Sequence, residues 1–176
     1  MRSDLSTRFW SKVDKSGDCW LWTAGTFGTG YGAFGIDGKM HSAHRVAYEL
    51  ENGPIPPKLV IDHICHTPKC VRPSHLRAAT VKQNLENRGG LDANNTSGVR
   101  GVHWNKNAGK WQARVKHEDK LIHIGYYADL NEAKEAAVAK RNELFSHNDL
   151  DRREQAIQEA AEVFAHWLTT DQEVAA

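Results

Sequence analysis

The sequence predicts an α+β protein with two small domains and a helical tail. In its first half, short aromatic runs broken by glycine lead into a loop rich in cysteine and histidine, which is typical of hairpins beside a metal site. In its second half, runs that alternate polar and apolar residues precede an alanine-rich stretch with helical spacing. We therefore expect a first domain over residues 1–90, a linker over 91–98, a three-stranded antiparallel sheet with one helix over 99–148, and a helical tail over 149–176.

The composition excludes a membrane protein and favours a metal site over disulfides. Of the 176 residues 26% are charged, and the mean hydropathy is −0.63. No apolar run approaches a membrane span, and the first ten residues do not resemble a secretory signal, so we expect a cytoplasmic protein with no membrane partner. Three cysteines would leave one thiol over in a disulfide framework, whereas thiols close to histidine in a reducing compartment indicate metal ligands.

The net charge of +1 conceals an uneven distribution. Residues 97–127 carry six Lys or Arg against two Asp or Glu, whereas residues 149–176 carry two against seven. A basic middle indicates a binding site for a polyanion, and an acidic end indicates a solvated helix. The charge alone fits an ordinary solvated surface equally well.

The first domain begins with hairpins and a helix. Short aromatic runs broken by glycine predict β-hairpins, and Asp37-Gly38 predicts a tight turn. Small and apolar residues recur at helical spacing over residues 42–52, and Gly53-Pro54 ends this helix.

The Cys/His-rich loop lies between two short predicted strands. These strands cover residues 59–62 and 76–79. Thr80 and Gln83 form a capping box, so a helix is expected to begin there and to reach about Arg88. The order is therefore strand, metal-rich loop, strand, helix.

The second domain has a clearer pattern. We expect strands over residues 99–104, 111–117 and 121–125. Asp129 is expected to cap a helix, with Glu132 at the capping-box position. The inner face of this helix is expected to carry Ala133, Ala136, Ala137, Lys140 and Leu144, so that the opposite face of the sheet presents Gln112, Arg114 and Lys116.

The tail over residues 151–168 has an amphipathic pattern. Its apolar stripe consists of Ile157, Ala160, Ala161, Phe164 and Leu168. The simplest interpretation is a helix packed on its own domain, and a contact in a homodimer is the alternative.

Cys65, Cys70 and His75 have the spacing of a tetrahedral zinc site. A structural zinc site takes four protein ligands, and the candidates for the fourth are Cys19, His63 and His66. Adjacent Cys65 and His66 would be awkward on one ion, so Cys19 is the expected fourth ligand. The alternative is that Cys19 is a buried thiol packed beside two tryptophans.

This assignment leaves His63 outside the zinc site. It follows Asp62 at the end of a predicted strand. An imidazole beside a carboxylate is a candidate general base because its pKa is near neutrality, although a single histidine is more often structural.

The residues His63, Cys65, Cys70, His75 and Asn84 resemble the His-Cys box of homing endonucleases. They are also similar to the wider zinc-bearing HNH nucleases, which share a ββα-metal core. The resemblance covers residues 8 to 90, and the upstream run H-R-V-A-Y-E-L resembles phage-encoded HNH proteins. It implies that His63 activates water, that Asn84 binds a catalytic magnesium, and that the Cys and His residues hold structural zinc.

The same resemblance implies further roles and marks one departure. Arg45 would contact the scissile phosphate. Asp62 would either be a second magnesium ligand or orient the turn. Many relatives have an asparagine where this chain has Arg72, and that asparagine braces the loop that carries the base.

The second domain resembles the APETALA-type (ethylene-response-factor) DNA-binding domain. The similar runs are R-G-V, G-K-W-Q-A-R-V-K, I-G-Y-Y and E-A-A within residues 97–146. The resemblance implies that the sheet enters the major groove of double-stranded DNA, which a β-ribbon fits. The expected DNA contacts are Arg100, His103, Trp104, Lys110, Trp111, Arg114 and Lys116. We therefore expect an endonuclease that uses Zn²⁺ and Mg²⁺, and the alternative is a non-catalytic zinc-containing DNA-binding regulator.

Overall fold

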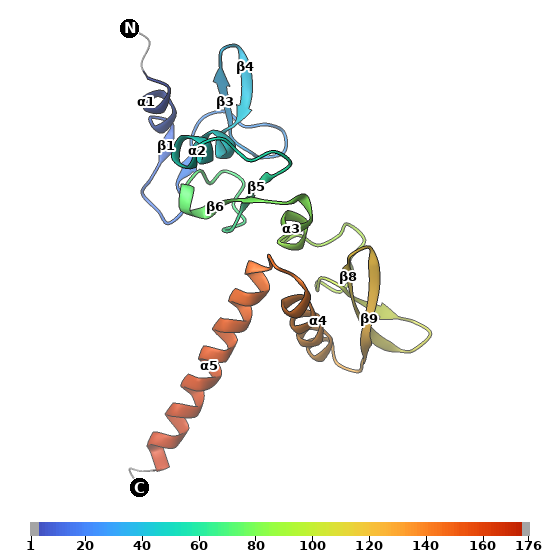
Figure 1. The fold of residues 1–176 in the computed structure, drawn as a ribbon. Helices are drawn as coiled ribbons and strands as arrows, with labels where there is room; N and C mark the ends of the chain where they lie inside the picture. The colour runs from blue at the N-terminus through green and yellow to red at the C-terminus, as the bar shows by residue number, and fades with distance from the viewer. Residues whose placement is uncertain (1–3, 174–176) are drawn as a thin grey trace. The chain divides into compact units, whose positions relative to one another are not determined.

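The computed structural model describes residues 4–173, with side chains described to Trp167. Helices alternate with small antiparallel sheets, which confirms the α+β class (Figure 1). The chain divides into two compact units, and the boundary along the sequence falls between Leu85 and Glu86. Among the described residues, no helix has both the length and the apolar character needed to cross a membrane.

The first unit consists of short elements around one aromatic core. Its elements are α1 (Leu5–Trp10), β1 (Val13–Asp14), β2 (Leu21–Trp22), β3 (Ala33–Ile36), β4 (Lys39–Ser42), α2 (Ala43–Asn52), β5 (Val60–His63), a 3₁₀ turn (Pro73–His75), β6 (Leu76–Ala79) and α3, which begins at Val81 and ends at Glu86. The strands pair as three antiparallel hairpins: β1 with β2, β3 with β4, and β5 with β6. Phe9 is fully buried against Trp22 and Phe34, so helix α1, which the sequence did not predict, belongs to the core.

The predicted turn and helix of the first unit are confirmed. Asp37 and Gly38 both have positive φ and connect β3 to β4. Helix α2 ends at Gly53, whose φ of 80° favours glycine. Gly32 is required for a different reason, because a Cβ there would lie 2.6 Å from the Trp22 ring.

Strands β5 and β6 flank the Cys/His-rich loop as predicted. They pair antiparallel, with Asp62 opposite Arg77. The capping box is also confirmed: the Thr80 amide donates to Gln83 Oε1 at 2.9 Å, and the Gln83 amide donates to Thr80 Oγ1 at 3.2 Å. Helix α3 is thereby fixed directly after β6.

The second unit contains the predicted three-stranded sheet. Its elements are β7 (Val102–Asn105), β8 (Lys110–His117), β9 (Lys120–Tyr127), α4 (Leu130–Leu144) and α5 (Asp149–Glu173), and the strand order is β7-β8-β9. Strand β7 begins three residues later than predicted. Gly101 has a φ of 79°, and its carbonyl accepts a hydrogen bond from the Arg114 amide at 2.8 Å, so residues 99–101 form a turn.

Helix α4 packs on the sheet through small residues. Asp129 caps it, because its Oδ1 accepts hydrogen bonds from the amides of Asn131 and Glu132. Ala133 and Ala137 are fully buried, as predicted. The prediction for Lys140 is wrong: its ammonium pairs with Glu143, and the buried cation of α4 is Arg141.

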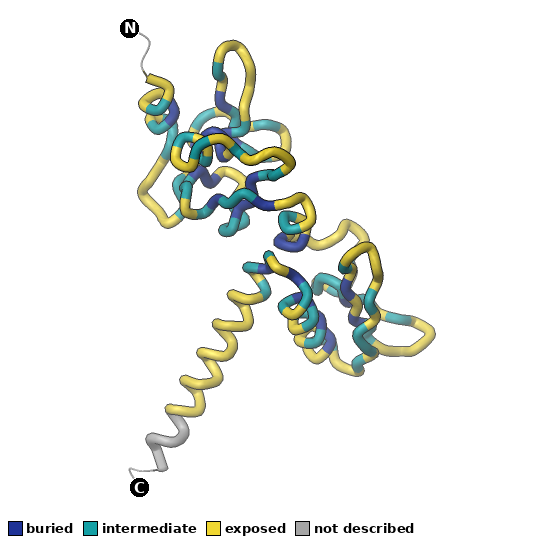
Figure 2. The backbone as a smooth tube through the Cα atoms, in the orientation of Figure 1, coloured by how far each residue is buried: buried dark blue, intermediate teal, exposed yellow. Residues whose placement is uncertain are grey.

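Helix α5 does not pack on its own domain, and that prediction is wrong. Residues 152–167 are all exposed, as Figure 2 shows. Ile157 is 61% exposed and Phe164 is 59% exposed, so the apolar stripe lies in solvent. Leu168 lies outside the residues whose side chains are described. The first turns of the helix are held by polar contacts: Arg141 donates two hydrogen bonds to the carboxylate of Asp151, and Asn142 Nδ2 donates to Gln155 Oε1 at 2.6 Å.

Candidate metal centre and active site

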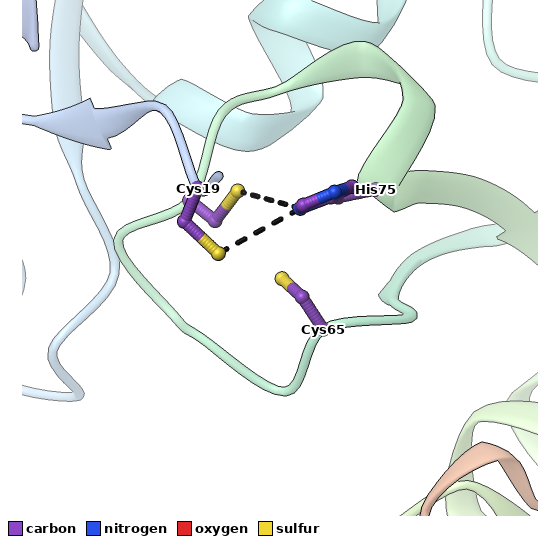
Figure 3. Close-up of side chains that lie close together, drawn as sticks. Cys19, Cys65 and His75 are labelled. Atoms are coloured by element: carbon purple, nitrogen blue, oxygen red, sulfur yellow. Dashed lines mark hydrogen bonds between the residues drawn. The ribbon is translucent and has the colours of Figure 1, made fainter. Parts of the chain in front are cut away.

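Cys19, Cys65, Cys70 and His75 converge on one point of the first unit. Figure 3 labels three of them, Cys19, Cys65 and His75. Their ligand atoms all lie within 4.8 Å of one another. The Nδ1 atom of His75 is 3.6 Å from the Sγ atom of Cys19 and 3.6 Å from that of Cys70. Ligands of tetrahedral zinc at ordinary bond lengths are about 3.5–3.8 Å apart, so three thiols and one imidazole here fit that ion.

Backbone pairing brings Cys19 to the cluster from the first hairpin. The Trp22 amide donates to the Lys69 carbonyl at 2.9 Å, and the Val71 amide donates to the Trp20 carbonyl at 2.8 Å. These bonds align the strand after Cys19 with the chain around Cys70. Cys19 therefore lies in the cluster, as the sequence predicted, rather than in the aromatic core.

Asp18 and Arg72 stabilise the cluster from outside. Asp18 Oδ2 lies 3.8 Å from His75 Nε2, which is longer than a hydrogen bond but brings a negative charge close to the imidazole. Arg72 Nη1 donates to the carbonyl and the carboxylate of Asp18 at 2.7 and 2.8 Å. Arg72 thus links the loop to the residue next to Cys19.

One thiol of the cluster is suited to deprotonation, that of Cys65, whereas the hydrogen bond to Cys65 and burial raise the pKa of Cys70. A hydrogen bond from Cys70 is the largest influence that lowers the pKa of Cys65, to about 4. The thiolate is the form that binds zinc. His66, the other candidate for the fourth ligand, is not part of the cluster; its φ is 56°, and its Nε2 is buried without a hydrogen-bond partner among the described residues.

His63 is buried at the end of β5 and is hydrogen-bonded through one ring nitrogen. Its Nε2 lies 2.9 Å from the carbonyl oxygen of Cys70. A carbonyl oxygen only accepts, so Nε2 carries the proton and the lone pair of the neutral ring is on Nδ1. Burial lowers the pKa of His63 from its ordinary value, although the hydrogen bond to Cys70 opposes this change. The ring is therefore neutral near pH 7, which is the form a general base requires.

Asp62 points to the other face of the strand and pairs with a cation. Its Oδ2 accepts from Arg77 Nε at 2.9 Å and from Arg77 Nη2 at 2.8 Å. The Asp62 side chain is 5% exposed. This contact favours the interpretation that Asp62 orients the strand, and its magnesium role stays a prediction.

Asn84 and Arg45 lie on two helices of the first unit. Asn84 is half-buried in α3, where its amide donates to the Thr80 carbonyl at 3.0 Å. Arg45 is exposed in the first turn of α2. An exposed guanidinium can reach a phosphate, and both residue roles stay predictions.

In the second unit, the outward face of the sheet is polar and basic. Gln112 accepts from Asn105 at 3.4 Å and bonds His123 at 3.0 Å, so one polar row crosses all three strands. Arg114 and Lys116 are exposed on the same face of β8. The predicted DNA contacts that belong to this face are His103, Lys110, Arg114 and Lys116.

The other predicted DNA contacts lie elsewhere. Trp104 and Trp111 pair across β7 and β8, with ring centroids 5.1 Å apart, on the face that carries Val102. Trp111 packs against the core beneath α4. Arg100 is held inside the second unit, because its Nη1 donates to the carbonyls of Glu86 and Arg88 at 3.0 and 2.8 Å.

The sequence reasoning missed two rings beside His63. His44 lies with its ring centroid 4.9 Å from that of His63, and Tyr31 lies 5.8 Å from His63. The only signal was the histidine next to Arg45 in the run A-H-R-V, which was interpreted as one face of a helix.

Residues 41–86 match the protein-family model described as HNH endonuclease. The chain is also 42% identical over 69 residues to Protein 7.7 of Escherichia phage T7, a region that is 39% of this chain and 53% of that protein. It is 38% identical over 82 residues to Protein 3.8 of the same phage, a region that is 47% of this chain and 67% of that protein. No solved structure matches the chain.

The chain belongs to the same family as Protein 3.8, and its residues 41–86 form an HNH endonuclease domain. It spans about half of the length of Protein 7.7. The matched segment contains every predicted nuclease residue except Cys19. The predicted HNH resemblance is thus confirmed for residues 41–86, whereas nuclease activity and the APETALA resemblance stay predictions.

Proposed function

We propose that the protein is a metal-dependent endonuclease that hydrolyses phosphodiester bonds in double-stranded DNA with His63 as general base. The observation that carries this proposal is the hydrogen bond from His63 Nε2 to the Cys70 carbonyl. It leaves the basic lone pair on Nδ1, where it can take a proton from water. The water oxygen then bonds to phosphorus, the bond from phosphorus to the 3′ oxygen breaks, and solvent protonates the leaving oxygen.

The other residues of the HNH domain have supporting roles. Asn84 would hold Mg²⁺, which when bound neutralises charge on the phosphate and on the leaving oxygen. Arg45 would contact the scissile phosphate, since it is exposed on α2. Cys19, Cys65, Cys70 and His75 would hold a structural zinc. A neutral amide is a weak magnesium ligand, so DNA oxygens and water would complete that site.

The second unit would direct the nuclease to DNA. Its outward face carries Arg114 and Lys116 beside the polar row of Asn105, Gln112 and His123. These groups suit phosphates and base edges in the major groove. An APETALA-type sheet of this kind would give the nuclease a preferred site, as in a free-standing homing endonuclease.

The same proposal extends to the oligomeric state of the protein and to its location in the cell. The exposed apolar stripe of α5 supports a homodimer, because exposed apolar surface of this extent marks contact sites. The two copies would then offer one active site to each DNA strand. The phage relatives favour the cytoplasm of a bacterial host.

A supercoiled-plasmid assay with magnesium tests the proposal. Wild type should nick or cut, and His63→Ala should lose about 10²–10⁴-fold in rate. His66→Ala is the matched control, because His66 lies outside the metal cluster in the same loop. Zinc content should be equal in all three proteins. If wild type binds DNA without cutting, or if His63→Ala cuts equally well, the protein is instead a non-catalytic DNA-binding regulator or uses another base.

A further inference from the structure

Two aromatic rings, those of His44 and Tyr31, lie beside the imidazole of His63. The ring of His44 lies 4.9 Å from that of His63 at an interplanar angle of 54°. Tyr31 contacts both histidines, with centroid distances of 5.0 Å to His44 and 5.8 Å to His63. Three rings from three separate segments therefore meet at the proposed base.

His44 is buried but not held by hydrogen bonds through Nδ1. It is 8% exposed, and its Nδ1 has no partner among the described residues. A buried polar atom without a partner is uncommon in folded proteins and calls for an explanation. The ring packs instead against the rings of Tyr31 and His63, and it lies on the buried face of α2 together with Ala43 and Ala47.

The neutral state of His44 is compatible with its buried position beside His63. Burial is the main cause that lowers the pKa of His44 to about 3, and His63 and Arg45 lower it further. The side chain is therefore uncharged at any pH where the enzyme would work. It does not compete with His63 as a base, and it adds no charge that would repel the imidazolium formed in the reaction.

We propose that His44 and Tyr31 are positioning residues that fix the plane of the His63 imidazole, so that Nε2 stays on the Cys70 carbonyl and Nδ1 stays in place for the attacking water. The hydrogen bond to Cys70 fixes the position of one ring atom, Nε2. Two rings packed at an angle against the imidazole restrict its plane. This inference rests on the proposed function of His63 as base.

The first test compares variants that keep or remove a ring. His44→Leu and Tyr31→Leu remove a ring, whereas His44→Phe and Tyr31→Phe keep it. In single-turnover cleavage of plasmid DNA, we expect each leucine variant to lower kcat by about 10²-fold, because small misplacement of a catalytic group has that effect. KM for DNA and zinc content should stay unchanged, and the phenylalanine variants should recover most of kcat.

The second test does not depend on cleavage. The ¹⁵N signals of His63 report which ring nitrogen carries the proton. We expect the Nε2–H form alone in wild type and in His44→Phe, and a mixture of both forms in His44→Leu and Tyr31→Leu. Zinc content and thermal midpoints identify a variant that has lost its fold. The NMR signals of the remaining variants then decide whether His44 and Tyr31 position the His63 ring.

The outcomes separate the two proposals. If wild type does not cut but the His63 signals change as expected, the positioning holds and the nuclease proposal fails. If His44→Phe is as inactive as His44→Leu, ring packing is not the cause and the positioning proposal is overturned. It is also overturned if the leucine variants keep both kcat and the single Nε2–H form.

Discussion

The Nε2 atom of His63 lies 2.9 Å from the carbonyl oxygen of Cys70, whose thiol belongs to the Cys/His cluster. The same residue can therefore hold a metal with its side chain and orient the base with its backbone. Under the proposed function, the position of the base would depend on the loop, and the loop would depend on the metal. The cluster would then be coupled to the chemistry although none of its four side chains takes part in it.

Removal of zinc should unfold the first unit and leave the second folded. Structural zinc sites contribute about 10–16 kcal/mol to folding in small domains, and the first unit otherwise has a core of short elements. Cys65→Ser should give the same result with less than one zinc per chain. NMR spectra recorded with and without chelator provide the measurement, with His66→Ala as the control that keeps its zinc. Equal loss of signals from both units would contradict the prediction.

Breaking the contact between Arg77 and Asp62 should destabilise the first unit strongly. Arg77→Leu would leave the Asp62 carboxylate, which is 5% exposed, buried without its cation. Loss of one partner of a buried pair costs about 3–5 kcal/mol. Urea unfolding followed by NMR signals of the first unit measures this cost. The double variant Asp62→Asn, Arg77→Leu should recover part of it, because the amide carries no charge.

The same aspartate decides between the two roles left open by the sequence. If Asp62 only orients the strand, Asp62→Asn should leave the magnesium concentration for half-maximal cleavage unchanged. A rise of about tenfold or more in that concentration would identify it as a magnesium ligand, because an amide binds Mg²⁺ less well than a carboxylate.

The first unit should lose stability in mild acid because of His44. Its folded pKa of about 3 is below the ordinary value of 6.5. Between these values the unfolded chain binds a proton that the folded chain does not, so the free energy of unfolding decreases as pH falls. From about pH 7.5 to about pH 5, wild type should lose about 2 kcal/mol more than His44→Phe. Zinc ligands are common to both proteins, so their titration cancels in this comparison. Equal losses would mean that His44 is protonated in the folded state.

Features set by neighbours in the sequence were predictable. The capping residues Thr80 and Asp129 act within three residues, and the turn at Asp37-Gly38 depends on local φ angles. The convergence of the four residues of the Cys/His cluster was also predictable, because chemistry limits which residue types can share an ion. Cys19 is far from the other three residues along the sequence, and it was predicted as their partner only because the chain has few cysteines.

Features set by contacts between distant segments were not predictable. The ring of Tyr31 meets His44 and His63 only after the hairpins have folded. Arg100 looked like a DNA contact within a basic run, but the carbonyls of Glu86 and Arg88 bind its guanidinium. An amphipathic pattern shows that a helix has an apolar face and does not say what covers it. The pattern therefore could not predict that residues 152–167 of α5 are exposed.

Arg114 and Lys116 should account for the salt dependence of DNA binding. Each phosphate contact contributes a slope of about 0.9 to the plot of log affinity against log salt concentration. Arg114→Ala and Lys116→Ala should each lower that slope by about one contact, and the double variant should lower it by about two. Fluorescence anisotropy with a short duplex over a range of salt concentrations measures the slope.

Arg153→Ala is the matched control for these variants. Arg153 is an exposed cation on α5, so its substitution removes the same charge. Its slope should equal that of wild type. Arg100→Ala should instead lower the stability of the second unit, since its guanidinium binds two carbonyls there. If Arg153→Ala lowers the slope as much as Arg114→Ala does, DNA responds to the total charge of the second unit, and the outward face of the sheet is not its binding site.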